Sequence, residues 1–317
     1  MTLSVWPVDG IGEIVPGDDL AAIIVEHLDE PLADGDVVVV TSKVVSKAAG
    51  LATTADRDSL IEAETDRVVA RRGQTRIVRT HAGLTLAAAG IDASNLEAGS
   101  VIPLPPDPDQ SARDLLAHLQ ELTGVRLGVI ITDTAGRAWR IGQTDIAIGA
   151  AGIRPVLSFE GVEDSYGNVL AVTAPAVADE IAGAADLVAG KLGGVPVVVV
   201  RGLPSEWFAI DAPGASALIR DEDGDMFGLG ARDAVLVAAG NGDTRGFPAP
   251  DDDHDLIALA REGVDLALAD VELVNGAIEV SAKSGSPEAH VASGVLAERL
   301  RILSRALGQE TTIAIVE

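Results

Sequence analysis

The chain reads D-V-V-V-V-T-S-K-V-V-S-K-A-A-G over residues 36–50. Its four consecutive valines predict a buried strand, because β-branched side chains pack well in a sheet that is covered on both faces. Hydroxyl groups and two of the chain's four lysines, Lys43 and Lys47, follow directly. Such groups at the end of an apolar strand suit an anionic ligand. The alternative is a solvated strand-to-loop transition, since charged residues are mostly at the surface.

The 317-residue chain is rich in apolar residues and strongly acidic. Apolar residues make up 47% and aromatic residues only 3%, so we expect a core of Val, Leu, Ile and Ala. The length exceeds the usual single core and predicts two domains or one elaborate domain. The net charge of −26 argues against a nucleic acid or an anionic membrane as partner.

Cysteine is absent, which excludes disulfides and cysteine metal sites and favours a cytoplasmic location. The first ten residues have no basic region followed by an apolar one, so we expect no secretory signal. No apolar run reaches the length of a membrane span. The sequence therefore predicts a cytoplasmic protein.

Strand and helix patterns alternate along the chain and predict an α/β protein with mixed sheets and flanking helices. Helical spacing covers residues 19–27, 60–72 and 176–192, and Ser111 is the expected N-cap of a helix that ends at Leu122. Short apolar runs predict strands at residues 37–40, 127–131 and 195–200. Residues 213–252 are rich in Gly and Asp and less regular.

A distinct tail follows a largely acidic stretch at residues 248–255, which we interpret as a linker. Helices are predicted at residues 255–268 and 287–307, and a strand at residues 311–316. Between them, Asn275-Gly276 indicates a type I′ hairpin over residues 271–280. The predicted domains are residues 1–247 and 248–317.

Two polar turns are candidates for ligand binding. Asp92 and Asn95 lie three residues apart in a turn, where a carboxylate and an amide can take a metal and a base or ribose. Asp and Asn also fill ordinary turns. Asp133 and Thr134 end the strand L-G-V-I-I-T, and open α/β sheets place ligands at the carboxyl ends of strands.

The segment after Thr134 combines glycines and arginines in A-G-R-A-W-R-I-G-Q-T-D. Glycine lets a backbone approach a ligand, and Arg137 and Arg140 would suit a carboxylate or phosphate. A salt-bridged loop is the alternative. Gly190-Lys191 ends the predicted helix at residues 176–192 and carries a third lysine; taken alone, this pair is better explained as a plain helix C-cap.

Several familiar motifs are missing from the sequence. There is no G-x-x-x-x-G-K-[ST] phosphate loop, and no G-x-G-x-x-G follows a strand. The five histidines form no H-x-x-x-H pair, which argues against a zinc hydrolase. Oxygen ligands from Asp92, Asp133 and Thr134 would instead suit magnesium or manganese.

Several long motifs occur in the order typical of one family. They are I-G-E-I-V-P-G-D-D-L, V-V-V-V-T-S-K-V-V-S-K, A-A-A-G-I-D-A-S-N, I-T-D-T-A-G-R-A-W-R-I-G-Q-T-D-I-A-I-G, D-S-Y-G-N-V-L-A-V-T and P-V-V-V-V-R-G. On these motifs, about residues 5 to 235 resemble the coenzyme F-420-0:L-glutamate ligase family. The resemblance implies the fold of γ-glutamyl ligases and an intertwined homodimer.

The resemblance also implies an activity. GTP would phosphorylate the lactyl carboxylate of coenzyme F-420-0, L-glutamate would then displace phosphate, and further γ-linked glutamates could follow. Two divalent ions, magnesium or manganese, are implied, together with a monovalent cation such as potassium. The expected partners are therefore small molecules, with no nucleic acid and no membrane.

Site roles come from the same resemblance. Catalytic roles are implied for Lys47 and Asp133, and metal ligation for Asp92, Asp133 and Thr134. Nucleotide contacts are implied for Ile11, Gly12, Glu13, Ile14, Ser42, Lys43, Lys47, Asn95, Gly190 and Lys191.

The chain departs from the family pattern at two places, and two other functions stay open. Ile11-Gly12 replaces the usual Leu-Pro before Glu13, and Ile141 stands where Asn is common. One alternative is a ligase of the same fold that acts on a different carboxylate or amino acid. The other is a non-catalytic guanine-nucleotide-binding module.

Overall fold

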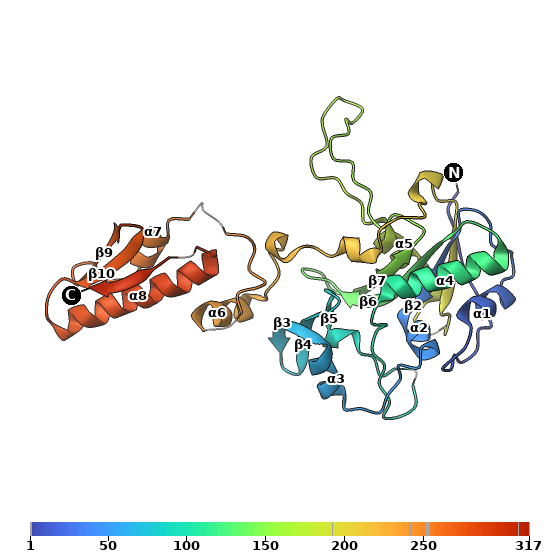
Figure 1. Cartoon of the computed structure of the whole chain (residues 1–317), viewed down its shortest axis with the longest axis horizontal. Helices are drawn as coiled ribbons and strands as arrows, with labels where there is room; N and C mark the ends of the chain where they lie inside the picture. The colour runs from blue at the N-terminus through green and yellow to red at the C-terminus, as the bar shows by residue number, and fades with distance from the viewer. Residues whose placement is uncertain are drawn as a thin grey trace. The chain divides into compact units, whose positions relative to one another are not determined.

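The computed structural model describes residues 2–94, 96–191, 193–240, 243–250, 254–309 and 311–316. They fall into two compact units, Met1–Arg67 with Ile77–Ile219 and Val68–Arg76 with Arg220–Glu317 (Figure 1). Three sheets with flanking helices confirm the predicted mixed α/β class. The proposed division at residue 247 stays a prediction, and its linker includes residues 251–253, outside the described ranges.

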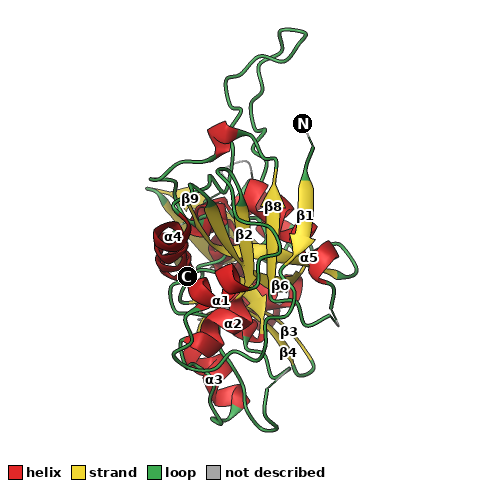
Figure 2. Cartoon of the chain, turned by 90° about the vertical axis from the view of Figure 1, so that its right-hand side faces the viewer, coloured by secondary structure: helices red, strands yellow, loops and turns green. Residues whose placement is uncertain are grey.

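A five-stranded sheet forms the centre of the first unit (Figure 2). The order is β1 (Ser4–Pro7), β8 (Val197–Arg201), β2 (Val37–Thr41), β6 (Gly128–Gly136) and β7 (Gln143–Ala151). β2 and β6 are parallel, and the other neighbours are antiparallel. The parallel pair brings the carboxyl ends of β2 and β6 to one edge of the sheet.

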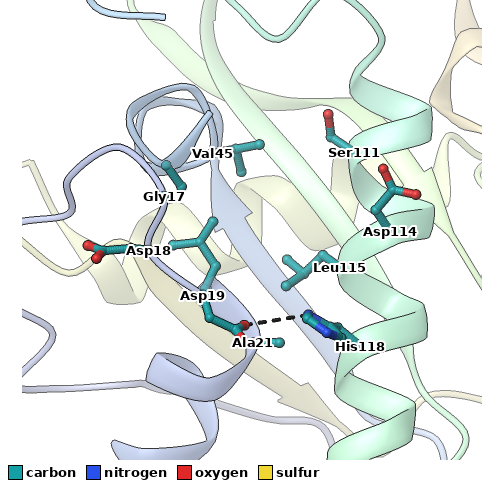
Figure 3. A pocket seen from close by; sticks show the side chains of 11 residues that line it. Gly17, Asp18, Asp19, Ala21, Val45, Ser111, Asp114, Leu115 and His118 are labelled. Carbon is teal, nitrogen blue, oxygen red and sulfur yellow. Dashed lines mark ion pairs between the residues drawn. The ribbon is translucent and has the colours of Figure 1, made fainter. Parts of the chain in front are cut away.

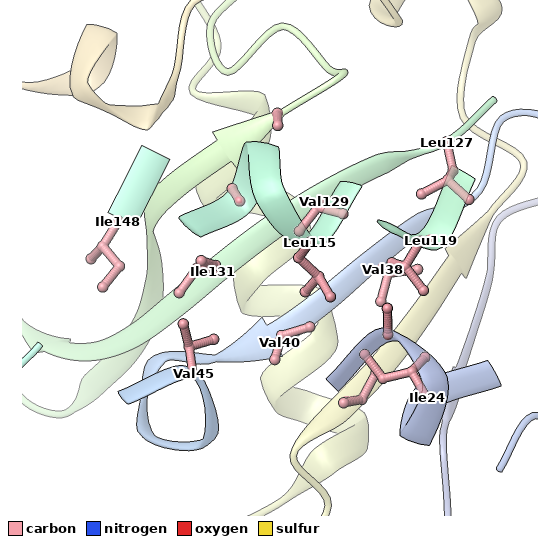
Figure 4. Packing of buried hydrophobic residues seen from close by; sticks show 14 of the residues in the cluster. Ile24, Val38, Val40, Val45, Leu115, Leu119, Leu127, Val129, Ile131 and Ile148 are labelled. Atoms are coloured by element: carbon pink, nitrogen blue, oxygen red, sulfur yellow. The ribbon is translucent and has the colours of Figure 1, made fainter. Parts of the chain in front are cut away.

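The valine run of β2 is buried on both faces, as predicted. Val38 and Val40 pack in a core with α1 (Leu20–Glu26) and α4 (Pro108–Thr123), which Figure 4 shows around Leu115 and Leu119. Val37 and Val39 belong to the opposite core, which includes α5 (Val177–Ala189). Because side chains alternate along a strand, one run of four valines supplies both cores.

Two expected helix boundaries differ in the structure. α4 begins at Pro108, and the side chain of Asp107, not Ser111, caps it by accepting from the backbone N–H of Gln110. Proline suits the first helical position because its missing N–H would have no partner there. α5 is shorter at both ends than residues 176–192.

The predicted helix over residues 60–72 is wrong in its second half. α3 (Arg57–Glu64) ends there, and β3 (Thr65–Arg72) follows, in a sheet with β4 (Thr75–Thr80) and β5 (Thr85–Ala87). Val68 and Val69 favour a strand because β-branched side chains lose freedom in a helix. Acidic residues early in this segment, Glu62 and Glu64, and basic residues late, Arg71 and Arg72, suit a helix dipole and favoured the helix prediction, but they did not keep the segment helical.

A long hairpin-shaped loop over residues 157–175, the arm, leaves the first unit between β7 and α5. Backbone hydrogen bonds join residues 157 and 175, 159 and 173, and 161 and 170. Both views show the arm extending from the body of this unit (Figures 1 and 2). Exposed apolar side chains line it, with Tyr166 90%, Val169 63% and Val172 91% exposed.

The second unit has its own core. Its sheet has the order β11 (Ile313–Val316), β10 (Ala277–Ala282) and β9 (Ala269–Val274), and it packs with α7 (Leu256–Arg261) and α8 (Pro287–Leu307). Asn275 and Gly276 both have positive φ, 53° and 84°, which confirms the hairpin prediction. Helix α6 (Ala231–Ala239) was not predicted, and α7 ends well before residue 268.

Short helices complete the described structure. α2 (Ser42–Ala48) follows β2 directly, and 3-10 turns lie at Ala88–Gly90, Ser205–Trp207, Ala215–Leu218 and Glu222–Gly224. Among the described residues, no helix combines the length and the apolar character needed to cross a membrane.

Candidate active site

The site lies where β2 and β6 run side by side. Thr41 is the last residue of β2 and pairs with Thr132 of β6. Asp133 and Thr134 come next, but β6 continues to Gly136, so the prediction that they end the strand is wrong. The extra length comes from pairing with β7, in which Thr134 lies opposite Asp145.

Lys43 connects α2 to the turn that follows residue 91. Its Nζ lies 2.7 Å from Asp92 Oδ2 and donates to the Ser94 carbonyl and hydroxyl oxygens at 3.1 and 2.8 Å. Partial burial of Asp92 opposes its ionisation, but hydrogen bonds from Lys43 and Ser94 outweigh burial and lower its pKa to about 2. Asp92 is therefore a carboxylate at neutral pH.

Lys47, one helical turn after Lys43, pairs with a different acidic residue. It is only 8% exposed, and its Nζ lies 2.5 Å from Glu13 Oε1. The Glu13 side chain itself is 73% exposed. Lys47 is thus a mostly buried ammonium group whose carboxylate partner is accessible to solvent.

Asp133 has the most strongly shifted pKa of the site. Its pKa is raised to about 7, mainly by burial and also by the negative charges of Asp145 and Asp92. A hydrogen bond from the backbone N–H of Thr134 and the positive charge of Lys191 act in the opposite direction and lower the pKa. Asp92, Asp133, Asp145 and Lys191 therefore lie close enough to influence one another electrostatically. Negative charge concentrates at Asp133, which favours binding of a cation.

Thr134 lies between a carboxylate and an ammonium group. Its hydroxyl donates to Asp145 Oδ1 at 2.8 Å, and Lys191 Nζ donates to the same hydroxyl at 2.8 Å. Thr132 donates to the other oxygen, Asp145 Oδ2, at 3.0 Å. Gly190 is the C-cap of α5, with φ 62°, and its N–H donates to the Asp186 carbonyl. This places Lys191 directly after the end of the helix.

The other predicted nucleotide-binding residues differ in accessibility. Ile14 is only 5% exposed, so its side chain belongs to the interior, and Ile11 packs against the core. Ser42 is buried at the start of α2, whereas Gly12 is exposed. Asn95 lies outside the described residues.

A divalent ion needs several oxygen donors within reach of one another. Among the described residues, no three Asp, Glu, His or Cys side chains form a group that could hold a metal ion. Asp92 and Asp133 nevertheless repel each other, and both supply hard oxygen donors with the Thr134 hydroxyl nearby. Oxygen donors are the type that magnesium or manganese prefers, but such an ion would need its remaining ligands from substrate phosphates and water.

Sequence reasoning gave no site role to two carboxylates. Asp145 orients both threonine hydroxyls of β6 and adds charge beside Asp133. Burial raises the pKa of Asp186, in the last part of α5, and Asp145 raises it further. Asp145 was noted only as part of a polar span, because its contacts depend on the β6–β7 pairing.

A separate cavity lies between α1, α2 and α4. It measures about 430 Å³, and its lining includes Asp114, Val45 and the pair of Asp19 and His118, whose Oδ1 and Nδ1 atoms lie 3.5 Å apart (Figure 3). None of the predicted site residues lines it. We therefore place the site at the strand edge, where the charges converge. Arg137 and Arg140 are exposed in the β6–β7 connection, and no contact of theirs with the cluster is seen in the described part of the chain.

Comparison with known proteins identifies the family. A family model described as F420-0:Gamma-glutamyl ligase matches residues 10–60 and 55–202. The chain is 40% identical over 252 residues to the coenzyme F420:L-glutamate ligase of Methanothermobacter thermautotrophicus, covering 72% of this chain and 99% of that protein. The proteins of the same name from Methanopyrus kandleri and Methanosarcina acetivorans are each 39% identical, over 71% of this chain and 98% and 95% of their own lengths. On this evidence the chain belongs to the F420-0:gamma-glutamyl ligase family.

Proposed function

We propose that this chain is a GTP-dependent ligase that joins L-glutamate to coenzyme F-420-0. Family membership supports glutamate ligation to F420. The observation that carries the proposal is the convergence of Lys43 and Lys191 with Asp92 and Asp133 at one edge of the sheet. Fixed ammonium groups beside carboxylates suit the positioning of phosphates and of a carboxylate substrate.

The reaction has two steps. A carboxylate oxygen of F-420-0 attacks the γ-phosphorus of GTP, and GDP leaves. The glutamate amine then attacks the acyl carbon, phosphate leaves with the bonding electron pair, and the amine loses a proton. No covalent protein nucleophile is required, in keeping with a chain that has no cysteine.

Lysines of α2 bind and orient the anionic groups in this proposal. Lys47 exchanges Glu13 for a phosphate, because it is the buried partner of an exposed carboxylate. Lys43 stays on Asp92 and holds the turn beside the sheet. Asp145 orients the hydroxyl of Thr134 toward the site.

Asp92, Asp133 and Thr134 would hold a divalent ion, magnesium or manganese. When bound, such an ion neutralises phosphate charge and polarises the transferred group. Asp133 suits this role because burial and neighbouring carboxylates disfavour its own negative charge. A dependence on potassium and a cytoplasmic location stay predictions.

The proposed protein is a homodimer. The arm of residues 157–175 supports this proposal because it carries three exposed apolar side chains, Tyr166, Val169 and Val172, close together in the chain. A second copy of the chain is the natural partner for such an arm in a symmetric assembly.

GDP release tests the function. We expect sustained GDP release over many turnovers only when both F-420-0 and L-glutamate are present, and strong loss of that release in Asp133→Asn. Asp164→Asn, which makes the same change in the arm, should keep the activity. Equal release without glutamate would contradict ligation, and release with another carboxylate in place of F-420-0 would favour a related ligase of the same fold.

A further inference from the structure

The connection between β6 and β7 carries an exposed aromatic ring between two arginines. It consists of residues 137–142, in which Trp139 stands between Arg137 and Arg140. Trp139 is 86% exposed, and both arginines are exposed as well. Tryptophan is on average a well-buried residue because its ring is large and mostly apolar. The exposure of this ring therefore needs an explanation.

The backbone holds Trp139 in a conformation that bulky residues rarely adopt. Its φ is 67°, in the left-handed region that favours glycine and asparagine. A glycine or an asparagine would fit this turn at a lower conformational cost, so folding alone does not explain the tryptophan. Strained positions of this kind cluster at ligand sites, where binding rather than folding favours the residue.

The same connection concentrates positive charge in a strongly acidic chain. The chain has 49 acidic residues against 23 lysines and arginines, yet residues 134–144 contain two arginines and no acidic residue. Arg137 donates to the Ile141 carbonyl at 3.3 Å, and among the described residues neither Arg137 nor Arg140 forms an ion pair. Guanidinium groups suit phosphate, and indole and guanidinium planes both stack on flat rings. The connection therefore suits a ligand that combines a flat ring with a phosphate.

The connection extends directly from the candidate active site. Thr134 lies two residues before the end of β6 at Gly136, which is roughly 7 Å along a strand. In the sheet, β7 lies on one side of β6 and β2 lies on the other. The connection therefore leaves the site on the side away from β2. Lys47, the proposed phosphate ligand, lies instead on α2, which follows β2.

We propose that Trp139 stacks on the deazaflavin ring of F-420-0 while Arg137 and Arg140 bind its phosphate. This inference rests on the proposed function and assigns the subsite of its acceptor. F-420-0 carries the reacting carboxylate at one end and the flat ring at the other, with a phosphate diester between them. In-line transfer places the attacking oxygen and the leaving GDP on opposite sides of the γ-phosphorus. With the nucleotide on the α2 side, the acceptor approaches from the side of the β6–β7 connection.

Equilibrium dialysis of F-420-0, and separately of GDP, against the full chain tests the proposal. Trp139→Asn removes the ring and tolerates the left-handed backbone. Its Kd for F-420-0 should rise at least about fivefold, the lower end for the loss of one stacking contact, while its Kd for GDP should match that of wild type. Trp139→Phe keeps a flat ring and should restore part of the affinity. Arg137→Gln combined with Arg140→Gln should weaken F-420-0 binding about two- to fivefold at low salt, and less at high salt, because exposed charges are screened.

Two variants outside the connection serve as controls. Phe227→Leu removes an exposed aromatic ring of the second unit, and Arg126→Gln removes an exposed guanidinium group just before β6. Both should bind F-420-0 as wild type does. Urea unfolding separates binding from folding, because Trp139→Asn relieves the backbone strain and should be at least as stable as wild type. Trp139→Gly fits the same φ and should give the same result.

The outcomes separate this inference from the proposed function. An unchanged F-420-0 affinity in both Trp139→Asn and Trp139→Gly, or a loss of GDP affinity in its place, would overturn the proposal. Glutamyl product formed by wild type would still support the ligase function in that case. A wild type that binds no F-420-0 and forms no glutamyl product would overturn the inference and the proposed function together.

Discussion

Removing the carboxylate of Asp133 should stabilise the metal-free protein at alkaline pH. Burial, with the charges of Asp145 and Asp92, raises the pKa of Asp133 from 3.8 to about 7. The folded state therefore binds a proton that the unfolded state releases in this range. The stability linked to this proton is fully present below about pH 4 and is lost as pH rises through about 7.

The magnitude follows from the shift. About three pKa units at 1.36 kcal/mol each correspond to about 4 kcal/mol of destabilisation at pH 8 and about 2 kcal/mol at pH 5. Asp133→Asn removes this destabilisation. In EDTA, the variant should exceed wild type in free energy of unfolding by up to about 4 kcal/mol at pH 8, and by roughly 2 kcal/mol less at pH 5.

Urea unfolding at the two pH values, followed by circular dichroism, measures the difference. Asp164→Asn is the matched control, because hydrogen bonds from Asn168 lower the pKa of that exposed carboxyl. The control should show no gain at pH 8. If Asp133→Asn were less stable than wild type at pH 8, or if its advantage did not change with pH, Asp133 would not be a buried, electrostatically strained carboxylate.

Three further predictions concern the nucleotide, the packing and the assembly. Lys47→Ala should weaken GTP binding or slow the reaction by on the order of 2–4 kcal/mol, and Lys47→Arg should restore part of the loss. The loss should depend little on salt, which calorimetry and rate measurements at two salt concentrations check. An unchanged affinity and rate would remove Lys47 from the site. Gly149→Ala should destabilise the fold by about 3 kcal/mol in urea unfolding, because the new Cβ would lie 2.2 Å from the Pro108 carbonyl oxygen. Gly136→Ala is the control and should be tolerated, because its Cβ would meet no heavy atom within 4 Å. Equal effects of the two substitutions would contradict the close approach at Gly149. Val169→Asp with Val172→Asp should convert a dimer into monomers in sedimentation velocity, and the same changes at Val291 and Val295 of α8 should not; a dimer that survives the arm changes would exclude the arm as its interface.

Elements with strong local signals could be predicted from the sequence. The valine run of β2 is buried on both faces as expected. α8 has the predicted bounds, because Ser286 caps its start and Gly308 ends it with φ 66°. At Asn275-Gly276, only residues that tolerate positive φ fit the turn, so the signal is specific.

Other features depend on contacts between distant segments. β3 was expected to be helical because its charges fit a helix dipole, while its pairing partner β4 lies beyond a turn. Lys43 and Asp92 are 49 residues apart in the chain and meet only when α2 and the turn lie side by side. The site role of Asp145 depends on the register of β6 and β7, in which it faces Thr134.

For the site residues, too, local signals could be predicted from the sequence, whereas roles that depend on distant contacts could not. Residue types at the end of β2 indicated an anionic ligand, and the structure brings Lys43, Asp92, Asp133, Thr134 and Lys191 together. Their assignment to nucleotide or metal came from the family resemblance and stays a prediction. Local pattern cannot tell a helix C-cap lysine from a site lysine, because both end a helix in the same way.

The product of the reaction tests the central claim most directly. The full chain is incubated with GTP, Mg²⁺, L-glutamate and F-420-0, and the deazaflavin product is analysed by mass spectrometry, with Asp133→Asn as the inactive control. The account predicts a product heavier than F-420-0 by one glutamyl residue or more, formed only when GTP and glutamate are both present. Unchanged F-420-0 under conditions in which the folded protein binds GTP would contradict it.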